Sequence, residues 1–485
     1  MFRRGASLVI ALLVGQAAAA IGQAPEELTE PPSPTPPQVF APRPLTIGEA
    51  LRAAFYGNPN LLDSEDLLYA ARVNEKGVAS TYLPQVTPFF STLRSQSTGI
   101  QAQAYGLTAS QQFSFGTLLE GSVLVTHAPF DSTDPTYRSD YIVTLSQPLL
   151  RGADPVVTAE PLRLARRTSD SRTRALETQR RRTVILIYQL YLGLAREEQA
   201  VSLAIDRMER AQKLTQFSRA RFLAGSVSRL DVLRAEQQEA SAVVDRNDAQ
   251  NLAEDLRDQL RRSAGLKPGF AFTIRPPAEI PSPEPPLDRA VYLVGARRLE
   301  AAEAREGIHD ARLAVRIAKS LQLPSLDGVL SYEGVGVGRT VGDALPARNP
   351  ALLFGFRSQY GLNSTVQYAQ RREAEIDLTT RERNFQLLEE DLVREVQRAY
   401  RRLDAQRRNY EIAAENLKVA ELQAKVARLR FEKGLSDNFN VVDADNLLNS
   451  ARLLDLDSRL SILLAQLDCL YASGYLDVAS FLQQP

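Results

Sequence analysis

Two long stretches of the chain place apolar residues at steps of three, four and seven. In the first stretch, at about 155–222, these positions are Val184, Ile187, Tyr191, Leu194, Val201, Ile205 and Met208. In the second, at about 365–431, they are Val396, Ala399, Leu403, Tyr410, Ala413, Leu417 and Ala420. A period near 3.5 residues, sustained over many turns, predicts coiled-coil helices. A helix of about 65 residues rises roughly 100 Å, which is far longer than a compact domain needs.

Before each of these stretches the hydrophobic period changes to two. Apolar residues alternate with polar or small ones at Leu107, Ala109, Phe113 and Phe115, and again at Phe354, Phe356, Tyr360 and Leu362. This alternation fits a half-buried sheet, either in a soluble sandwich or in a membrane barrel. We expect strands at about 85–150 and 325–362. The first block has room for more than two strands, with candidates at Val86–Leu93, Leu107–Phe115, Val123–His127 and Tyr141–Ser146.

Proline-rich segments divide the chain. Eight prolines lie between Ala24 and Pro44, and seven lie between Pro268 and Pro286. Because proline cannot continue a packed helix, these segments predict linkers. The predicted domains are a signal peptide (1–24), an N-terminal linker (25–44), a first repeat (45–265), a linker (266–286), a second repeat (287–476) and a C-terminal tail (477–485).

The two halves resemble each other. The motif Phe222-x-x-Gly225 returns 209 residues later as Phe431-x-x-Gly434, whereas Leu83-Pro84 returns after 240 residues as Leu323-Pro324. We interpret this as a tandem duplication with an elongated insert between Pro84 and Gln147-Pro148. Gly225 and Gly434 end the long helices, and return helices are expected at 228–265 and 437–473.

These elements predict a mainly α fold with a β part. In each half, one continuous long helix lies beside two shorter helices stacked end to end. The few strands of one chain cannot close a barrel, and an open sheet edge in lipid leaves backbone groups unsatisfied. If the strands enter a membrane, several copies must therefore combine.

The N-terminus has the features of a secretory signal peptide. Met1-Phe2-Arg3-Arg4 is followed by a short apolar stretch from Ala6 to Val14 and by small residues. Cleavage is expected after Ala20 or Ala24. No later stretch is apolar enough for a transmembrane helix, so membrane entry would use strands.

The composition argues against an enzyme. Lys plus Arg and Asp plus Glu both number 58, so no global charge attracts nucleic acid. The chain has two histidines, His127 and His309, and one cysteine, Cys469. These numbers disfavour metal chemistry and most histidine-dependent catalysis, and we expect no cofactor.

The motifs in their order resemble the outer membrane efflux protein family, the TolC-like channels of Gram-negative bacteria. They are Ala50-Leu51 through Asn58-Pro59, the Leu83-Pro84 and Leu323-Pro324 helix ends, Leu145-Ser146-Gln147-Pro148-Leu149, and the two Phe-x-x-Gly motifs, which are followed by Leu230-Asp231 and Phe439-Asn440. The resemblance covers nearly the whole mature chain.

This resemblance implies a homotrimer in the outer membrane that extends into the periplasm. Each chain would add four strands to one shared twelve-stranded transmembrane barrel, which a barrel of coiled-coil helices continues. The helical tips would dock on a periplasmic adaptor protein, coupled to an inner-membrane pump of the RND, ABC or MFS class. The resulting channel would conduct substrates passively for efflux or type I secretion.

The resemblance also assigns residues at the tips. Relatives carry acidic residues one turn apart on the pore side of the second tip helix, where this chain has Asn440 and Asp443. Phe431 takes an aromatic position that packs in the closed entrance. The tips, with their adaptor contacts, comprise Arg221, Phe222, Gly225, Arg430 and Gly434.

Other interpretations stay open at this point. Asp443 fits an ordinary solvated helix residue, and Phe431 fits simple coiled-coil packing. The eight arginines from Arg163 to Arg182 are interpreted as a solvated helix face. A secreted or periplasmic coiled-coil scaffold, with its strands in a small soluble sheet, is the alternative function.

Overall fold

The computed structural model describes residues 44–94, 101–128, 136–267, 269–274, 285–433, 435–436 and 438–482. The predicted signal peptide, all but Pro44 of the predicted N-terminal linker, and Gly434 lie outside these residues. The chain divides into two units, which are treated separately. The described part of the first contains residues 67–173 and 304–384, and that of the second contains 44–66, 174–303 and 385–482.

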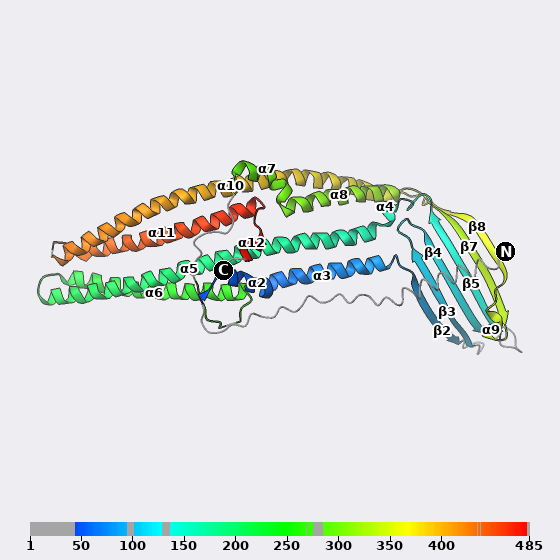
Figure 1. Cartoon of the computed structure of the whole chain (residues 1–485), viewed down its shortest axis with the longest axis horizontal. Coiled ribbons are helices and arrows are strands. Elements are labelled where there is room, and N and C mark those ends of the chain that lie inside the picture. The colour runs from blue at the N-terminus through cyan, green and yellow to red at the C-terminus, as the bar shows by residue number, and fades with distance from the viewer. Residues whose placement is uncertain are drawn as a thin grey trace. The chain divides into compact units, whose positions relative to one another are not determined.

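The first unit contains a six-stranded antiparallel sheet (Figure 1). Its strands, in spatial order, are β2 (Gln85–Arg94), β3 (Gln101–Gln112), β4 (Leu118–Ala128), β5 (Thr136–Pro148), β7 (Ser325–Gly338) and β8 (Arg348–Gln359). The short helix α9 (Val341–Ala344) lies between the last two strands. The candidates at 86–93, 123–127 and 141–146 lie within strands, whereas the candidate at 107–115 is a strand only as far as Gln112, and Phe113 and Phe115 lie in the following turn. The resemblance implied four strands per chain, and this expectation is wrong because the described sheet has six.

The sheet has two chemically different faces. Residues two apart share a face, and the register places Phe90 and Val125 on the two sides of Tyr105. This apolar face carries Phe90, Tyr105, Leu107, Val123, Val125, Tyr141, Val143, Leu330, Tyr332, Leu352, Phe354 and Phe356. Apart from the terminal Arg94 and Arg348, the charged residues of these strands lie on the opposite, polar face: Glu120, Arg138, Asp140, Asp327, Glu333 and Arg357.

Parts of four helices belong to the same unit: α3 (Pro59–Ser80), α5 (Glu160–Leu223), α8 (Leu299–Ser320) and α10 (Thr365–Glu432). A four-residue helix, α4 (Pro155–Thr158), precedes α5. Ion pairs join neighbours in this order. The N–O distance is 3.7 Å between Arg166 and Glu75 (α5 to α3) and 2.9 Å between Arg312 and Glu382 (α8 to α10). Arg167 on α5 pairs with Asp310 on α8.

These ion pairs correct the interpretation of the arginine-rich segment. Arg166 and Arg167 reach neighbouring helices instead of forming only a solvated face. In the second unit, Arg174 lies 2.7 Å from Glu303 and Arg180 lies 3.2 Å from Glu65. The segment therefore links α5 to α3 and to α8 through charge.

The second unit has a compact apolar core. It collects α2 (Ile47–Gly57), α12 (Val478–Leu482), the middle of α5, and a parallel pair of two-residue strands, β1 (Pro44–Leu45) and β6 (Thr273–Ile274). Tyr188 is fully buried and its ring meets that of Phe481 edge-on, with centroids 5.5 Å apart. Residues 478–482, expected as tail, thus form a helix whose Phe481 belongs to the core.

Two helical hairpins form much of the second unit (Figure 1). In one hairpin α5 pairs with α6 (Arg229–Ser263), and in the other α10 pairs with α11 (Asn438–Ala472). The long helices α5 and α10 contain 64 and 68 residues, close to the predicted stretches. The remaining helix is α7 (Leu287–Arg297), which leads directly into α8.

A buried arginine connects α7, α10 and the end of α11. The side chain of Arg298 is 6% exposed and donates to Glu300 at 3.0 Å and to Glu395 at 3.1 Å. Its Nη1 also donates to the carbonyls of Tyr471 and Ala472, both at 3.2 Å, at the C-terminal end of α11. Burial alone would raise the pKa of Glu300, but backbone hydrogen bonding and Arg298 outweigh it and lower the pKa. The buried guanidinium charge of Arg298 is therefore hydrogen-bonded to two carboxylates and two backbone carbonyls.

We predict that Arg298→Ala lowers the free energy of unfolding by about 3 kcal/mol, because it leaves Glu395 and two helix-end carbonyls without their donor. Arg298→Lys should have an intermediate effect, since an ammonium group cannot reproduce the planar guanidinium contacts. Thermal unfolding followed by circular dichroism measures both. Arg289→Ala, at an exposed position on α7, is the matched control. Equal stability of Arg298→Ala and Arg289→Ala would contradict the assignment.

Candidate functional site

The turns between the hairpin helices are closed by matching hydrogen bonds. At the first turn Gly225 has a φ of +70°, and its N–H donates to the Phe222 carbonyl at 2.9 Å. The Ser226 N–H donates to the Arg221 carbonyl at 2.9 Å, which completes a Schellman motif. At the second turn the Leu435 N–H donates to the Arg430 carbonyl at 2.8 Å, 209 residues further on. Arg221 and Arg430 therefore occupy equivalent backbone positions.

The start of α6 explains the acidic residue in the first tip motif. Ser228 caps the helix, and its Oγ accepts from the Asp231 N–H at 3.2 Å. The Asp231 carboxylate in turn accepts from the Ser228 N–H at 3.0 Å. This reciprocal capping box gives Asp231 a structural role at the turn.

Three side chains join the two hairpins next to these turns, and we call them the tip cluster: Phe217, Arg221 and Phe431. The Arg221 guanidinium lies 5.0 Å from the ring centroid of Phe217 and 5.1 Å from that of Phe431. The two rings meet edge-on at 5.5 Å. Phe431 is only 5% exposed. Cation–π and aromatic contacts therefore link α5 to the end of α10.

The structure brings together some predicted tip residues and separates others. Phe431 and Arg221 meet in the tip cluster, whereas Phe222 is 39% exposed and Arg430 is exposed on the other hairpin. Phe217 was missed by sequence analysis, although its position one helical turn before Arg221 is a usable signal. Within one chain, Phe431 packs between the hairpins. Its place in a closed entrance stays a prediction.

The two pore candidates lie exposed near the start of α11. Asn440 and Asp443 are three residues apart and so share one helix face. The Asn440 amide donates to the Ser436 hydroxyl at 2.9 Å. Asp443 forms no ion pair or hydrogen bond within the described part of the chain.

Further polar contacts tie α5 to α11 behind the tips. Arg210 donates to Asn449 at 2.9 Å and lies 3.8 Å from the Asp445 carboxylate. Arg207 reaches Asn446 at 3.1 Å and also pairs with Asp245 on α6. Burial lowers the pKa of Arg210, and Asp445 partly offsets this effect. These contacts are polar and partly buried, so the two hairpins are held by charge and hydrogen bonds.

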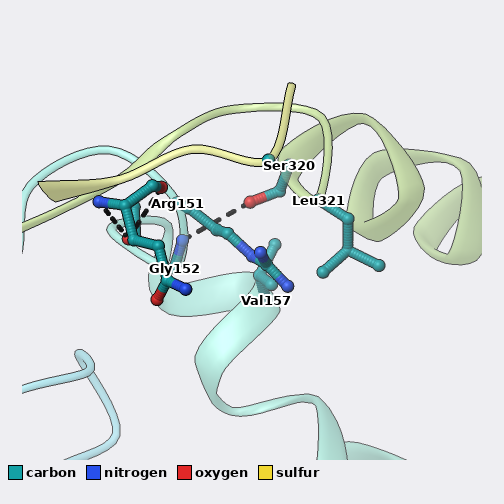
Figure 2. A pocket seen from close by; sticks show the side chains of 8 residues that line it. Arg151, Gly152, Val157, Ser320 and Leu321 are labelled. Carbon is teal, nitrogen blue, oxygen red and sulfur yellow. Dashed lines mark hydrogen bonds between the residues drawn. The ribbon is translucent and has the colours of Figure 1, made fainter. Parts of the chain in front are cut away.

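The first unit contains a recess where helix ends meet the sheet. Figure 2 shows Arg151, Gly152, Val157, Ser320 and Leu321 around this recess of about 470 Å³. The Gly152 N–H donates to the Ser320 hydroxyl at 3.5 Å. Its lining contains no cluster of acid, base and nucleophile. Across the described residues, no group of three or more histidine, cysteine or acidic side chains is placed to hold a metal ion.

None of the described helices combines the length and the apolar character that a membrane-spanning helix requires.

Comparison with known proteins identifies the fold. No protein-family model and no curated protein matches the chain. Among solved structures, CusC aligns over 88% of this chain and 92% of its own, with a TM-score of 0.68 and 14% identity. The outer-membrane channel OprN aligns over 88% and 89%, with a TM-score of 0.66 and 17% identity. The outer membrane protein VceC from Vibrio cholerae aligns over 88% and 96%, with a TM-score of 0.67 and 14% identity.

These similarities place the chain in a structural class. Nearly all of each compared channel is matched, so the likeness includes both the helices and the sheet. The chain has the fold of outer-membrane channel proteins. At these identities the comparison concerns the fold.

We predict that Arg221→Ala loosens the link between the hairpins. Losing two cation–π contacts should speed amide hydrogen exchange around Gly225 and at the end of α10 by about tenfold. Hydrogen–deuterium exchange with mass spectrometry measures this change. Arg430→Ala removes the equivalent but exposed arginine and should leave exchange unchanged. Identical exchange in both variants would rule out a role for the tip cluster.

Proposed function

We propose that the protein is an exit duct in the outer membrane of a Gram-negative bacterium, a member of the outer membrane efflux protein family. It would serve a tripartite efflux system or a type I secretion system and extend into the periplasm. Substrates would pass through it passively, since an inner-membrane pump supplies the energy. Such a duct needs neither a catalytic residue nor a cofactor.

One observation carries this proposal: the fold likeness to outer-membrane channels runs through 88% of the chain. The two-faced sheet supports it, because a barrel wall presents apolar side chains to lipid and polar ones to a lumen. Aromatic residues of the apolar face, such as Phe90, Phe354 and Phe356, are 65% to 73% exposed in the single chain. This exposed apolar surface is consistent with contact to lipid.

The helix ends support the tandem duplication. Besides the two tip turns, Gly265 and Gly474 end α6 and α11 with φ values of +65° and +73°. The Leu266 N–H donates to the Arg261 carbonyl at 2.8 Å, and the Tyr475 N–H donates to the Leu470 carbonyl at 2.9 Å. Four helix ends thus fall into two pairs, each separated by 209 residues. A duplicated helical hairpin accounts for this spacing.

An unpartnered stripe on α10 supports assembly of several copies. Its exposed apolar residues follow the coiled-coil spacing: Ile412, Val419, Leu422, Val426 and Leu429. On α6, Leu230, Leu233, Val244 and Leu252 are also exposed. In a homotrimer these surfaces would pack against neighbouring copies. Each chain would contribute four helices side by side, which we call its helical columns. Three copies would then form a helical barrel of twelve columns.

The hairpin tips are the proposed contact for a periplasmic adaptor protein, through which an RND, ABC or MFS pump is coupled. Arg221, Phe222, Gly225, Arg430 and Gly434 belong to this region. On the inner side, Asp443 would form a ring of three carboxylates around the axis, with Asn440 one turn away. Such a ring favours cations over anions in a narrow entrance.

We predict that Asp443→Ala shifts the potassium-to-chloride permeability ratio toward unity in planar bilayers. Asn440→Asp should shift the ratio the other way, because it adds a second acidic ring. Asp248→Ala, which removes an exposed acid of α6, is the control. An unchanged ratio in Asp443→Ala would remove this residue from the pore.

Cell fractionation tests the function itself. A duct is expected in the outer membrane and resists carbonate extraction, and it should migrate as a trimer in mild detergent. The alternative, a periplasmic coiled-coil scaffold, predicts a protein that is released with the soluble fraction. Bilayers that stay silent after addition of the purified trimer would count against conduction.

A further inference from the structure

The described sheet contains two strands more than the resemblance implied. Matching positions in the two halves are 240 residues apart before the strands and 209 residues apart after them. The strand block of the first half is therefore longer by 31 residues. The β3–β4 hairpin spans 101–128 and accounts for nearly all of this difference. Counting from the two ends, β2 corresponds to β7 and β5 corresponds to β8. The added element is therefore the β3–β4 hairpin.

This hairpin is part of the sheet and not an appendage. β3 pairs with β2 from Gln85↔Ser110 to Arg94↔Gln101, and β4 pairs with β5 from Leu118↔Ser146 to Ala128↔Thr136. The six strands contain 10, 12, 11, 13, 14 and 12 residues. About 9–11 residues span a bilayer when tilted, so β3 and β4 are as long as a membrane wall requires.

The added strands also share the two faces of the other four. Tyr105, Leu107, Val123 and Val125 lie on the apolar face, whereas Thr108, Ser122 and Glu120 lie on the polar face. A hairpin in a barrel wall needs this alternation, because one side meets lipid and the other meets water.

The ends of the sheet are suited to pairing with another copy. β2 and β8 are the edge strands, and neither carries a charged residue between its first three and its last three positions. Natural edge strands that remain unpaired are usually protected by charge or proline, and Pro88 of β2 is the single such residue in the middle of either strand. Since the strand number is even and all pairings are antiparallel, β8 of one copy would meet β2 of the next in antiparallel orientation.

The width of the sheet agrees with that of the helices in the same unit. Four helices at about 9–10 Å spacing cover an arc of roughly 38 Å. Six strands spaced about 4.8 Å apart and tilted about 40° cover nearly the same arc. Four strands would cover only about 25 Å at this tilt and would need a tilt near 60° to match. The six strands fit the four helical columns without this steeper tilt.

We propose that three copies of this chain close one eighteen-stranded barrel, in which β3 and β4 are wall strands and β8 pairs with β2 of the neighbouring copy. This inference rests on the proposed outer-membrane trimer. Because barrel diameter grows about linearly with strand number, the barrel is about half again as wide as a twelve-stranded one. The duct would therefore admit a wider cargo at its outer end.

Electron cryomicroscopy of the detergent-extracted complex counts the strands, and native mass spectrometry counts the copies. The expected result is three copies and eighteen strands. Three copies around a twelve-stranded wall, with β3–β4 outside it, would overturn this inference but leave the duct in place. Two copies with twelve strands would overturn both the inference and the proposed trimer.

A matched pair of variants tests the added hairpin in cells. Val123→Arg puts a charge on the apolar face of β4, and Ser122→Arg puts the same charge on the polar face one residue earlier. For a wall strand, Val123→Arg should reduce the trimer recovered from outer membranes by about fivefold or more, while Ser122→Arg stays near wild type. Equal recovery of the two variants would place β4 outside the membrane wall. Absence of the wild-type chain from outer membranes would instead refute the proposed function.

Discussion

The unpaired backbone N–H and C=O groups at the two edges of the sheet are the main constraint on how this chain can assemble. Within the described strands, β2 and β8 each have a neighbour on one side only. In water such an edge invites association, and in lipid its unpaired N–H and C=O groups cost several kcal/mol each. The described residues offer no further strand to cover these edges, because outside the six-stranded sheet they form helices and two-residue strands. A closed assembly of copies satisfies both edges with the same contact.

The long helices are held by different contacts along their length, and only part of each helix packs in a large apolar cluster. The largest apolar cluster among the described residues lies around Tyr188, Tyr191 and Phe481. Toward the tips, α10 and α11 pack through small residues, in a cluster formed by Ala420, Ala424, Ala444, Leu448 and Ala451. Charged contacts such as Arg210 with Asp445 link neighbouring hairpins there. Interfaces of small residues and ion pairs cost less to rearrange than a large apolar core.

Sequence reasoning was most successful where the signal is local. The 3.5-residue period located α5 and α10, and the alternation located the strands. Pairing between distant segments was not readable, because periodicity identifies an apolar face without naming its partner. The contacts of Phe431 with Arg221 and Phe217 join two distant segments and have no local sequence signal. The place of Phe431 at a pore entrance stays a prediction. The helix at 478–482 was missed because five residues are too short to show a period. The strand count was taken from the resemblance, and only the register revealed that β3 and β4 belong to the sheet.

The two hairpins have diverged in a direction that their chemistry explains. Arg221 and Arg430 follow equivalent backbone positions, yet the first is held between two rings and the second is exposed. The first tip also has a capped helix start at Ser228 and Asp231. The corresponding acidic side chain of the second hairpin is replaced by Asn440, which is exposed. One hairpin thus carries an arginine held between two aromatic rings, and the other carries an exposed arginine at the equivalent position. In the proposed duct, this difference would let the first hairpin support the wall while the second faces the lumen.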